Sequence, residues 1–185
     1  MRLFVAVYPP AAAIRDLERV VAGLATASRN AGMIRSEIWH VTVTFLGEVP
    51  DDSLDAVAAA VGGAAGQSRP GRLALTRGGR FGDTVWVGVS TQDDALADLA
   101  RRVRRAVRAA GVRVERRAYH PHLTLARTRG RIRRDELALD LNVLRNYSGP
   151  EWTLDRVHLV QSQLGPTSRH TTVEHWRLAE DVYQA

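Results

Sequence analysis

The sequence contains no cysteine among its 185 residues. This absence excludes a disulfide framework, thiolate metal ligands and a cysteine nucleophile, and it is compatible with a reducing compartment. No apolar run approaches the roughly 18 residues of a membrane-spanning helix. The apolar run near the first residue is also too short for a secretory signal. We therefore expect a cytoplasmic protein that does not contact a membrane.

Lysine is also absent, so the formal net charge of +6 comes from arginine alone. The planar guanidinium group matches phosphate oxygens, which makes a polyanionic partner physically reasonable. A genomic base composition that favours arginine codons explains the same excess equally well. Arginines also line one face of a helix predicted between Asp93 and Ala110. We interpret that face as mainly solvated, with nucleic-acid contact as the alternative.

Hydrophobic residues make up 45% of the chain, enough for a single domain over residues 1–185 without disulfides or metals. Apolar periodicity predicts strands and helices that interleave along the chain, which is a mixed α/β organisation. The strands are expected at residues 3–8, 39–46, 72–76, 84–90, 113–116, 122–128, 154–161 and 171–178. The helices are expected at about residues 11–28, 51–65, 93–110 and 135–145.

A short motif is repeated in similar surroundings. Residues 39–47 read Trp-His-Val-Thr-Val-Thr-Phe-Leu-Gly, and residues 120–127 read His-Pro-His-Leu-Thr-Leu-Ala-Arg. The histidine and threonine content predicts about 0.4 occurrences of His-x-Thr by chance, whereas three occur. The third occurrence begins at His170 and lacks an apolar opposite face, so we interpret it as coincidental.

The first two motifs each place an imidazole beside a hydroxyl. Because side chains alternate along a strand, His40 is expected to share a face with Thr42 and Thr44, and His122 to share one with Thr124. The opposite face of the first strand is expected to carry Trp39, Val41, Val43 and Phe45. One such histidine alone would be read as a hydrogen-bonded sheet residue, but two copies in matching contexts favour a catalytic pair.

At these strands the sequence resembles the 2H phosphoesterase superfamily, which is named for two His-x-Thr-x motifs. The resemblance is strongest to its bacterial and archaeal RNA 2′,3′-cyclic phosphodiesterases, the 2′-5′ RNA ligase-like proteins. Further landmarks in family order extend the resemblance over nearly the whole chain, at residues 2–7, 45–47, 121–127 and 160–166. The sequence departs from the family at Trp39, where an aliphatic residue is common, and near His170, where a tyrosine is often found.

The resemblance implies an α+β fold with two pseudo-symmetric lobes, each with an antiparallel sheet and outer helices, around a central cleft. It further implies hydrolysis of RNA 2′,3′-cyclic phosphate ends to 2′-phosphomonoesters, with His40 as general acid and His122 as general base. Histidine suits both tasks because it takes or gives a proton near neutral pH. Thr42 and Thr124 would donate hydrogen bonds to the phosphoryl oxygens.

Other residues near the motifs are assigned lesser roles. Arg127 is a candidate phosphate contact if the strand bulges there, because strict alternation points it away from His122. Arg35 is a candidate guide for RNA. We interpret Trp39 and Tyr119 as packing residues. No metal and no cofactor are expected, since carboxylates are scarce near the motifs and cysteine is absent.

Two alternatives to cyclic phosphate hydrolysis remain open at this point. The same chemistry could act on 2′,5′-linked oligonucleotides or join RNA ends as a ligase. A non-catalytic RNA-binding module would also explain the arginine content. The expected partner is RNA with a 2′,3′-cyclic phosphate end or a small cyclic nucleotide, and the expected state is a monomer.

Overall fold

The computed structural model describes residues 1–115, 118–163, 165 and 168–179. Its strands are β1 (Arg2–Val7), β2 (Val41–Glu48), β3 (Gly71–Phe81), β4 (Thr84–Thr91), β5 (His122–Arg127), β6 (Ser148–Leu154), β7 (Arg156–Gln163) and β8 (Arg169–Arg177). Its α-helices are α1 (Ala11–Ala22), α2 (Ala25–Ser28), α3 (Leu54–Ala65), α4 (Ala95–Ala109) and α5 (Arg134–Arg145). Two short 3₁₀ helices, η1 (Ser36–Ile38) and η2 (Asp51–Ser53), precede β2 and α3.

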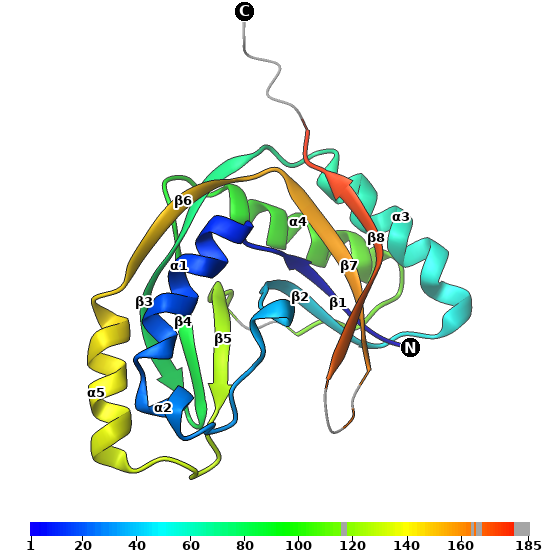
Figure 1. The fold of residues 1–185 in the computed structure, drawn as a ribbon. Coiled ribbons are helices and arrows are strands. Elements are labelled where there is room, and N and C mark those ends of the chain that lie inside the picture. The colour runs from blue at the N-terminus through cyan, green and yellow to red at the C-terminus, as the bar shows by residue number, and fades with distance from the viewer. Residues whose placement is uncertain (116–117, 164, 166–167, 180–185) are drawn as a thin grey trace, which may run out of the picture.

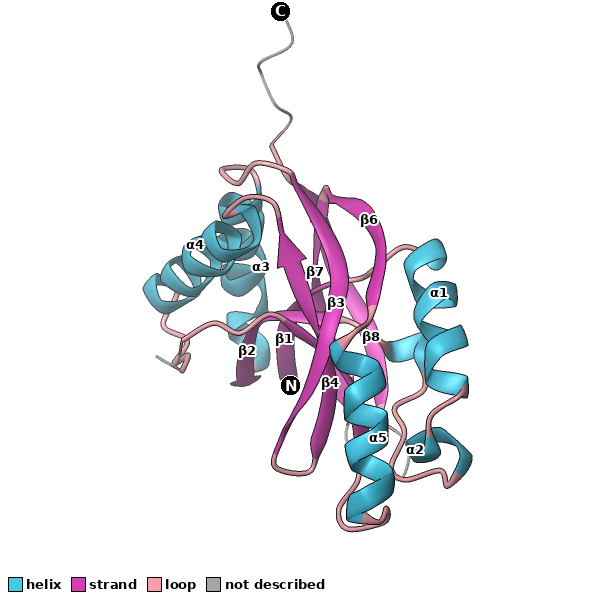
Figure 2. Ribbon diagram, turned by 90° about the vertical axis from the view of Figure 1, so that its left-hand side faces the viewer, coloured by secondary structure: helices cyan, strands magenta, loops and turns pink. Residues whose placement is uncertain are grey.

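All eight strands form one antiparallel sheet in the order β6-β3-β4-β5-β2-β1-β7-β8. The sheet curls into an arch, as Figure 1 shows. Helices α1 and α5 pack on β6 and β3, whereas α3 and α4 pack on β7, β8 and β2. Figure 2 shows these two groups on opposite sides of the strands. The expected α+β fold with antiparallel strands and outer helices is confirmed.

The two halves of the arch meet at one backbone pair. Strands β6, β3, β4 and β5 form one half, strands β2, β1, β7 and β8 form the other, and Val41 of β2 pairs with Leu123 of β5. We call Val41 and Leu123 the seam pair. Both side chains are fully buried, so the core passes beneath the junction without interruption. The predicted lobes are therefore halves of one continuous sheet.

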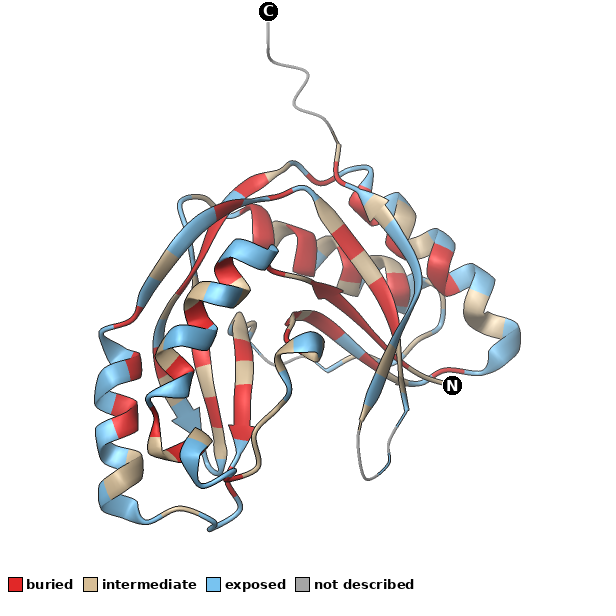
Figure 3. Ribbon diagram, in the orientation of Figure 1, coloured by how far each residue is buried: buried red, intermediate tan, exposed pale blue. Residues whose placement is uncertain are grey.

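The core follows the predicted periodicities. Buried and more exposed positions alternate along β5 and β7 in Figure 3. On α4, the apolar face is buried through Leu96, Leu99, Val103 and Val107. The arginines of the other face are exposed or half-buried, as an amphipathic surface helix requires.

Two predicted elements differ from the structure, and one strand of the structure was not predicted. The helix expected at residues 11–28 is split at Gly23, because Asp140 of α5 accepts hydrogen bonds from the backbone N–H groups of Ala25 and Thr26 and so starts a second helix there. Residues 113–115 form no strand, and Arg116 lies outside the described residues. Strand β6 was not predicted, because Gly149 and Pro150 obscure its pattern; an edge strand that pairs only with β3 tolerates both residues.

Within the described part of the chain, no helix is both long and apolar enough to cross a membrane.

Candidate active site

The repeated motifs come together across the seam pair. In the antiparallel register of that pair, His40 lies opposite Thr124, and Thr42 lies opposite His122. These four side chains project from the face opposite the buried seam pair. Each histidine therefore stands beside the threonine of the other motif.

The four side chains line one cleft of about 480 Å³. The cleft is also lined by Arg2, Phe4, Ile34, Ile38, Phe45, Arg127, Arg129, Ser162, Ser168 and His170. Three of these residues are arginines, and none of the described lining residues carries a carboxylate. The electrostatics of the cleft therefore favour an anion.

Both motif histidines are held in the same way. Nδ1 of His40 lies 2.8 Å from the carbonyl oxygen of Ile38, and Nδ1 of His122 lies 2.7 Å from that of His120. Because a carbonyl oxygen can only accept, Nδ1 carries the hydrogen in both neutral rings. Nε2 is therefore the atom of each ring that remains for proton transfer.

His40 occupies the more buried end of the site. Its ring centroid lies 4.7 Å from that of Phe4 and 5.1 Å from that of His170. Burial lowers the pKa of His40 to about 4, and the nearby charges of His170 and His122 act in the same direction. The free site therefore holds His40 as a neutral imidazole at pH 7.

The lowered pKa of His40 predicts acid-sensitive stability. Between pH 6.5 and 4 the unfolded chain binds a proton at His40 that the folded protein does not bind, so the free energy of unfolding falls as the pH falls. The expected loss from His40 is up to about 3 kcal/mol. Denaturant unfolding at pH 7 and pH 4 measures it, with His40→Gln as the comparison. Equal pH dependence in the two proteins would contradict the prediction, since His158 and His170, whose pKa values are also lowered by burial, are present in both.

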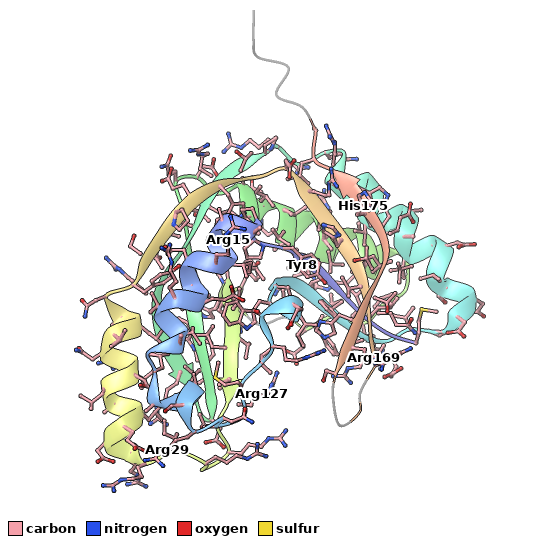
Figure 4. The ribbon with its side chains drawn as sticks, in the orientation of Figure 1. Tyr8, Arg15, Arg29, Arg127, Arg169 and His175 are labelled. Atoms are coloured by element: carbon pink, nitrogen blue, oxygen red, sulfur yellow. The ribbon has the colours of Figure 1, made fainter. Side chains whose placement is uncertain are left out.

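A β-bulge follows the threonine in both motif strands. The ladder from β1 to β2 skips Val43, and the ladder from β4 to β5 skips Leu125. An extra residue reverses the alternation beyond it. Arg127 therefore lies on the same side as His122 and lines the cleft. Figure 4 shows Arg127 on β5, on the inner side of the arch.

The bulge in β2 corrects the predicted faces of that strand. Thr44 was expected beside His40, but it is 4% exposed and does not line the cleft. Phe45 was expected in the core, but it is 42% exposed and lines the cleft at the position that corresponds to Arg127. Strict alternation fails here because the ladder skips one residue.

Gly32 holds the bulged end of β5 in place. Its carbonyl oxygen accepts a hydrogen bond from the backbone N–H of Arg127, 2.8 Å away. Its φ is +72°, and a Cβ at this position would lie 2.0 Å from the carbonyl oxygen of Arg127. Only glycine allows the two backbones to approach this closely.

We expect Gly32→Ala to lower the free energy of unfolding by about 3 kcal/mol, because the methyl group adds a backbone clash to an unfavourable φ. Gly130→Ala is the matched control, since Gly130 has a φ of +75° and no atom within 4 Å of its Cβ position. That variant should lose only about 1 kcal/mol. Urea unfolding of both variants measures the difference, and equal losses would refute the clash.

His170 belongs to the site, contrary to the interpretation of its motif as coincidental. Its ring lies edge-on to that of His40 and 5.0 Å from that of Phe4, and it lines the same cleft. Its Nδ1 is buried and has no hydrogen-bond partner among the described residues. His170 thus lacks the carbonyl contact that orients the two motif histidines.

The remaining sequence candidates are not among the residues that line the cleft. Arg35 is exposed. Trp39 is 4% exposed and donates its indole N–H to the carbonyl oxygen of Ile34. Tyr119 donates its hydroxyl to the carbonyl oxygen of Thr42. The two aromatic residues therefore support the motif strand, as predicted.

An aromatic pair that the motifs did not reveal lies beside His122. The rings of Phe81 and Trp86 stack at 4.8 Å, and their centroids lie 5.5 and 6.1 Å from that of His122. Phe81 is 49% exposed. The indole lies across Gly79, where a Cβ would approach Trp86 to 2.6 Å. A groove of about 1110 Å³ continues from this pair past Arg77 and Arg145.

The described residues include no group of three or more histidine, aspartate or glutamate side chains placed to hold one metal ion.

Comparison with known proteins gives a consistent picture. Residues 6–166 match the model of a family described as the 2′-5′ RNA ligase superfamily. An RNA 2′,3′-cyclic phosphodiesterase of Methanothermobacter thermautotrophicus is 28% identical over 172 residues, which cover 89% of this chain and 92% of that protein. A protein of the same name from Geobacillus stearothermophilus is 35% identical over 99 residues, covering 51% of this chain but only 31% of that protein.

The fold is also known from solved structures. The crystal structure of E. coli LigT complexed with NADP⁺ has a TM-score of 0.76 and 22% identity, and the match covers 96% of this chain and 97% of that one. The crystal structure of TT0787 from Thermus thermophilus has a TM-score of 0.73 and 23% identity, covering 98% of this chain and 100% of that one. At these identities the likeness concerns the fold.

Proposed function

This chain belongs to the 2′-5′ RNA ligase superfamily, and from that premise we propose that it hydrolyses RNA 2′,3′-cyclic phosphate ends to 2′-phosphomonoesters without a metal. The observation that carries the proposal is the arrangement of two His–Thr pairs on one cleft wall, with Nε2 of both histidines left for proton transfer. The names of the two RNA 2′,3′-cyclic phosphodiesterases agree with it.

Hydrolysis proceeds by in-line displacement at phosphorus. Nε2 of His122 takes a proton from water as the water oxygen bonds to phosphorus. The bond from phosphorus to O3′ breaks on the opposite side, and Nε2 of His40 gives its proton to O3′. The product carries a 2′-phosphate and a free 3′-hydroxyl.

The acid must be charged before this step, although the free site holds His40 neutral. The bound cyclic phosphate supplies a negative charge beside the ring, which raises the pKa of His40 and favours the imidazolium. Substrate binding thereby favours the protonated form of His40, which is the form that can act as the general acid. The hydroxyls of Thr42 and Thr124 and the guanidinium of Arg127 donate hydrogen bonds to the two non-bridging oxygens, where charge increases in the transition state.

The deciding experiment is hydrolysis of the four nucleoside 2′,3′-cyclic phosphates and of a short RNA with the same end, in the presence of EDTA. We expect turnover of these substrates and only the 2′-phosphate isomer as product. Loss of activity in EDTA that returns with added metal would refute the metal-free mechanism. A 3′-phosphate product would refute the assignment of O3′ as the leaving group.

A second candidate function is favoured by the aromatic pair of Phe81 and Trp86. In-line attack places the attacking oxygen on the His122 side, where a nucleoside stacked on these rings could present a 5′-hydroxyl in place of water. The P–O5′ bond would form as the P–O3′ bond breaks, giving a 2′,5′-phosphodiester. Incubation of a cyclic phosphate end with a 5′-hydroxyl oligonucleotide, followed by analysis for a 2′,5′ linkage, separates this function from hydrolysis.

A further inference from the structure

One wall of the cleft carries polar groups that the proposed hydrolysis does not use. They are Arg2 of β1, Ser162 of β7, Ser168 directly before β8, and His170 in β8. All four residues are half-buried. Ser162 and His170 are direct partners in the ladder between β7 and β8, so their side chains stand together.

The guanidinium of Arg2 is available for a ligand. Its central carbon lies 4.6 Å from the ring centroid of Phe45, which fixes the group over the cleft wall. Among the described residues, Arg2 has no ion-pair partner within 4.0 Å; Glu48, its partner in the strand ladder, lies instead 4.0 Å from the terminal amino group of Met1. A half-buried guanidinium of this kind makes its strongest hydrogen bonds with an anionic ligand, because those bonds are charge-assisted.

This wall lies on the side of the leaving group. His170 contacts His40, whose proton goes to O3′ in the proposed mechanism. The terminal ribose carries O3′ and must therefore lie on the His40 side. The next anion of the RNA chain is the phosphodiester on the 5′ oxygen of that same ribose, so it lies nearest to this wall.

We infer that Arg2, Ser162, Ser168 and His170 form a second anion subsite, which binds the phosphodiester on the 5′ side of the terminal nucleotide. The inference rests on the proposed function and on His40 acting at O3′. It makes the enzyme selective for the ends of RNA chains over nucleoside cyclic phosphates. The guanidinium supplies charge, and the hydroxyls and the imidazole supply hydrogen bonds to the two non-bridging oxygens.

A pair of substrates that differ by one group tests the subsite. Adenosine 2′,3′-cyclic phosphate lacks the 5′-phosphate that 5′-phosphoadenosine 2′,3′-cyclic phosphate carries. We expect kcat/KM of the wild-type protein to be about 10- to 100-fold higher for the 5′-phosphorylated substrate, as for a charge-assisted contact. The ratio of the kcat/KM values of the two substrates should fall towards 1 in Arg2→Gln. In Ser162→Ala this ratio should be smaller than in the wild-type protein. Arg156→Gln, at the far end of β7, is the charge-matched control and should keep the ratio.

The outcomes separate the subsite from the proposed function. The subsite is overturned if the wild-type protein has equal kcat/KM for the two substrates. It is also overturned if both Arg2→Gln and Ser162→Ala keep the wild-type ratio of the two kcat/KM values. If neither substrate is hydrolysed, the proposed function fails. Calorimetry with adenosine 2′,5′-bisphosphate and adenosine 2′-monophosphate then tests the subsite by binding alone. The subsite is supported if the wild-type protein binds the bisphosphate more tightly than the monophosphate and Arg2→Gln does not. Equal affinity of the wild-type protein for the two nucleotides overturns it.

Discussion

Replacing His40 or His122 by alanine is expected to lower kcat for a nucleoside 2′,3′-cyclic phosphate by about 10²- to 10⁴-fold. Each substitution removes one of the two proton transfers that in-line displacement requires. Because one concerted step uses both groups, the double variant should lose much less than the product of the two single losses. Steady-state hydrolysis at pH 7 with EDTA present measures all three proteins.

His175→Ala is the control for these histidine variants. His175 is an exposed imidazole on β8, with its ring centroid 5.5 Å from that of His158, and it does not line the cleft. Its loss should change kcat less than about twofold, as for a surface substitution away from the site. A fully active His40→Ala or His122→Ala variant would exclude the two-histidine mechanism. A wild-type protein that binds RNA, lacks turnover and keeps its affinity in both variants would instead be a non-catalytic RNA-binding module.

Arg127→Ala should lower kcat/KM by about 10²-fold, the usual effect of losing one donor to the oxygens of the transition state. The bulge at Leu125 is what brings Arg127 to the cleft, so the loss concerns a contact and not the core. Arg127→Lys should recover only part of the activity, because an ammonium group lacks the two parallel donors of a guanidinium.

The matched control for Arg127 is Arg131→Ala. Arg131 is exposed, follows Arg127 closely along the chain and does not line the cleft. Both substitutions remove one positive charge, so a general effect of net charge on RNA attraction would appear in both. Equal losses in the two variants would mean that Arg127 acts at long range and does not contact the phosphate.

The sequence was sufficient for the parts of the site that depend on local alternation. His40 and Thr42 share a face because only one residue separates them, and the same holds for His122 and Thr124. The antiparallel α+β fold was predicted from the family resemblance, whereas periodicity alone indicated only a mixed α/β organisation. Residues beyond the threonines could not be placed, because a bulge is a property of the ladder to the neighbouring strand. Phe45 and Thr44 exchanged their expected faces for this reason.

His170 was missed for a different physical reason. In the sequence, the lack of an apolar opposite face indicates coincidence, but β8 is an edge strand and most of its residues are exposed. An edge strand can present one residue to a cleft without a buried reverse side. The aromatic pair of Phe81 and Trp86 carried no sequence signal beyond two aromatic residues near a turn, since the stack depends on the space above Gly79.

The seam pair has a mechanical consequence. The two halves of the sheet share only this backbone pair among the described strands, and each motif histidine is the residue directly before a member of it. If one half swings relative to the other, the junction is the natural pivot, and atoms next to a pivot travel least. We therefore expect the spacing between the two imidazoles to change less than the width of the arch when the sheet flexes.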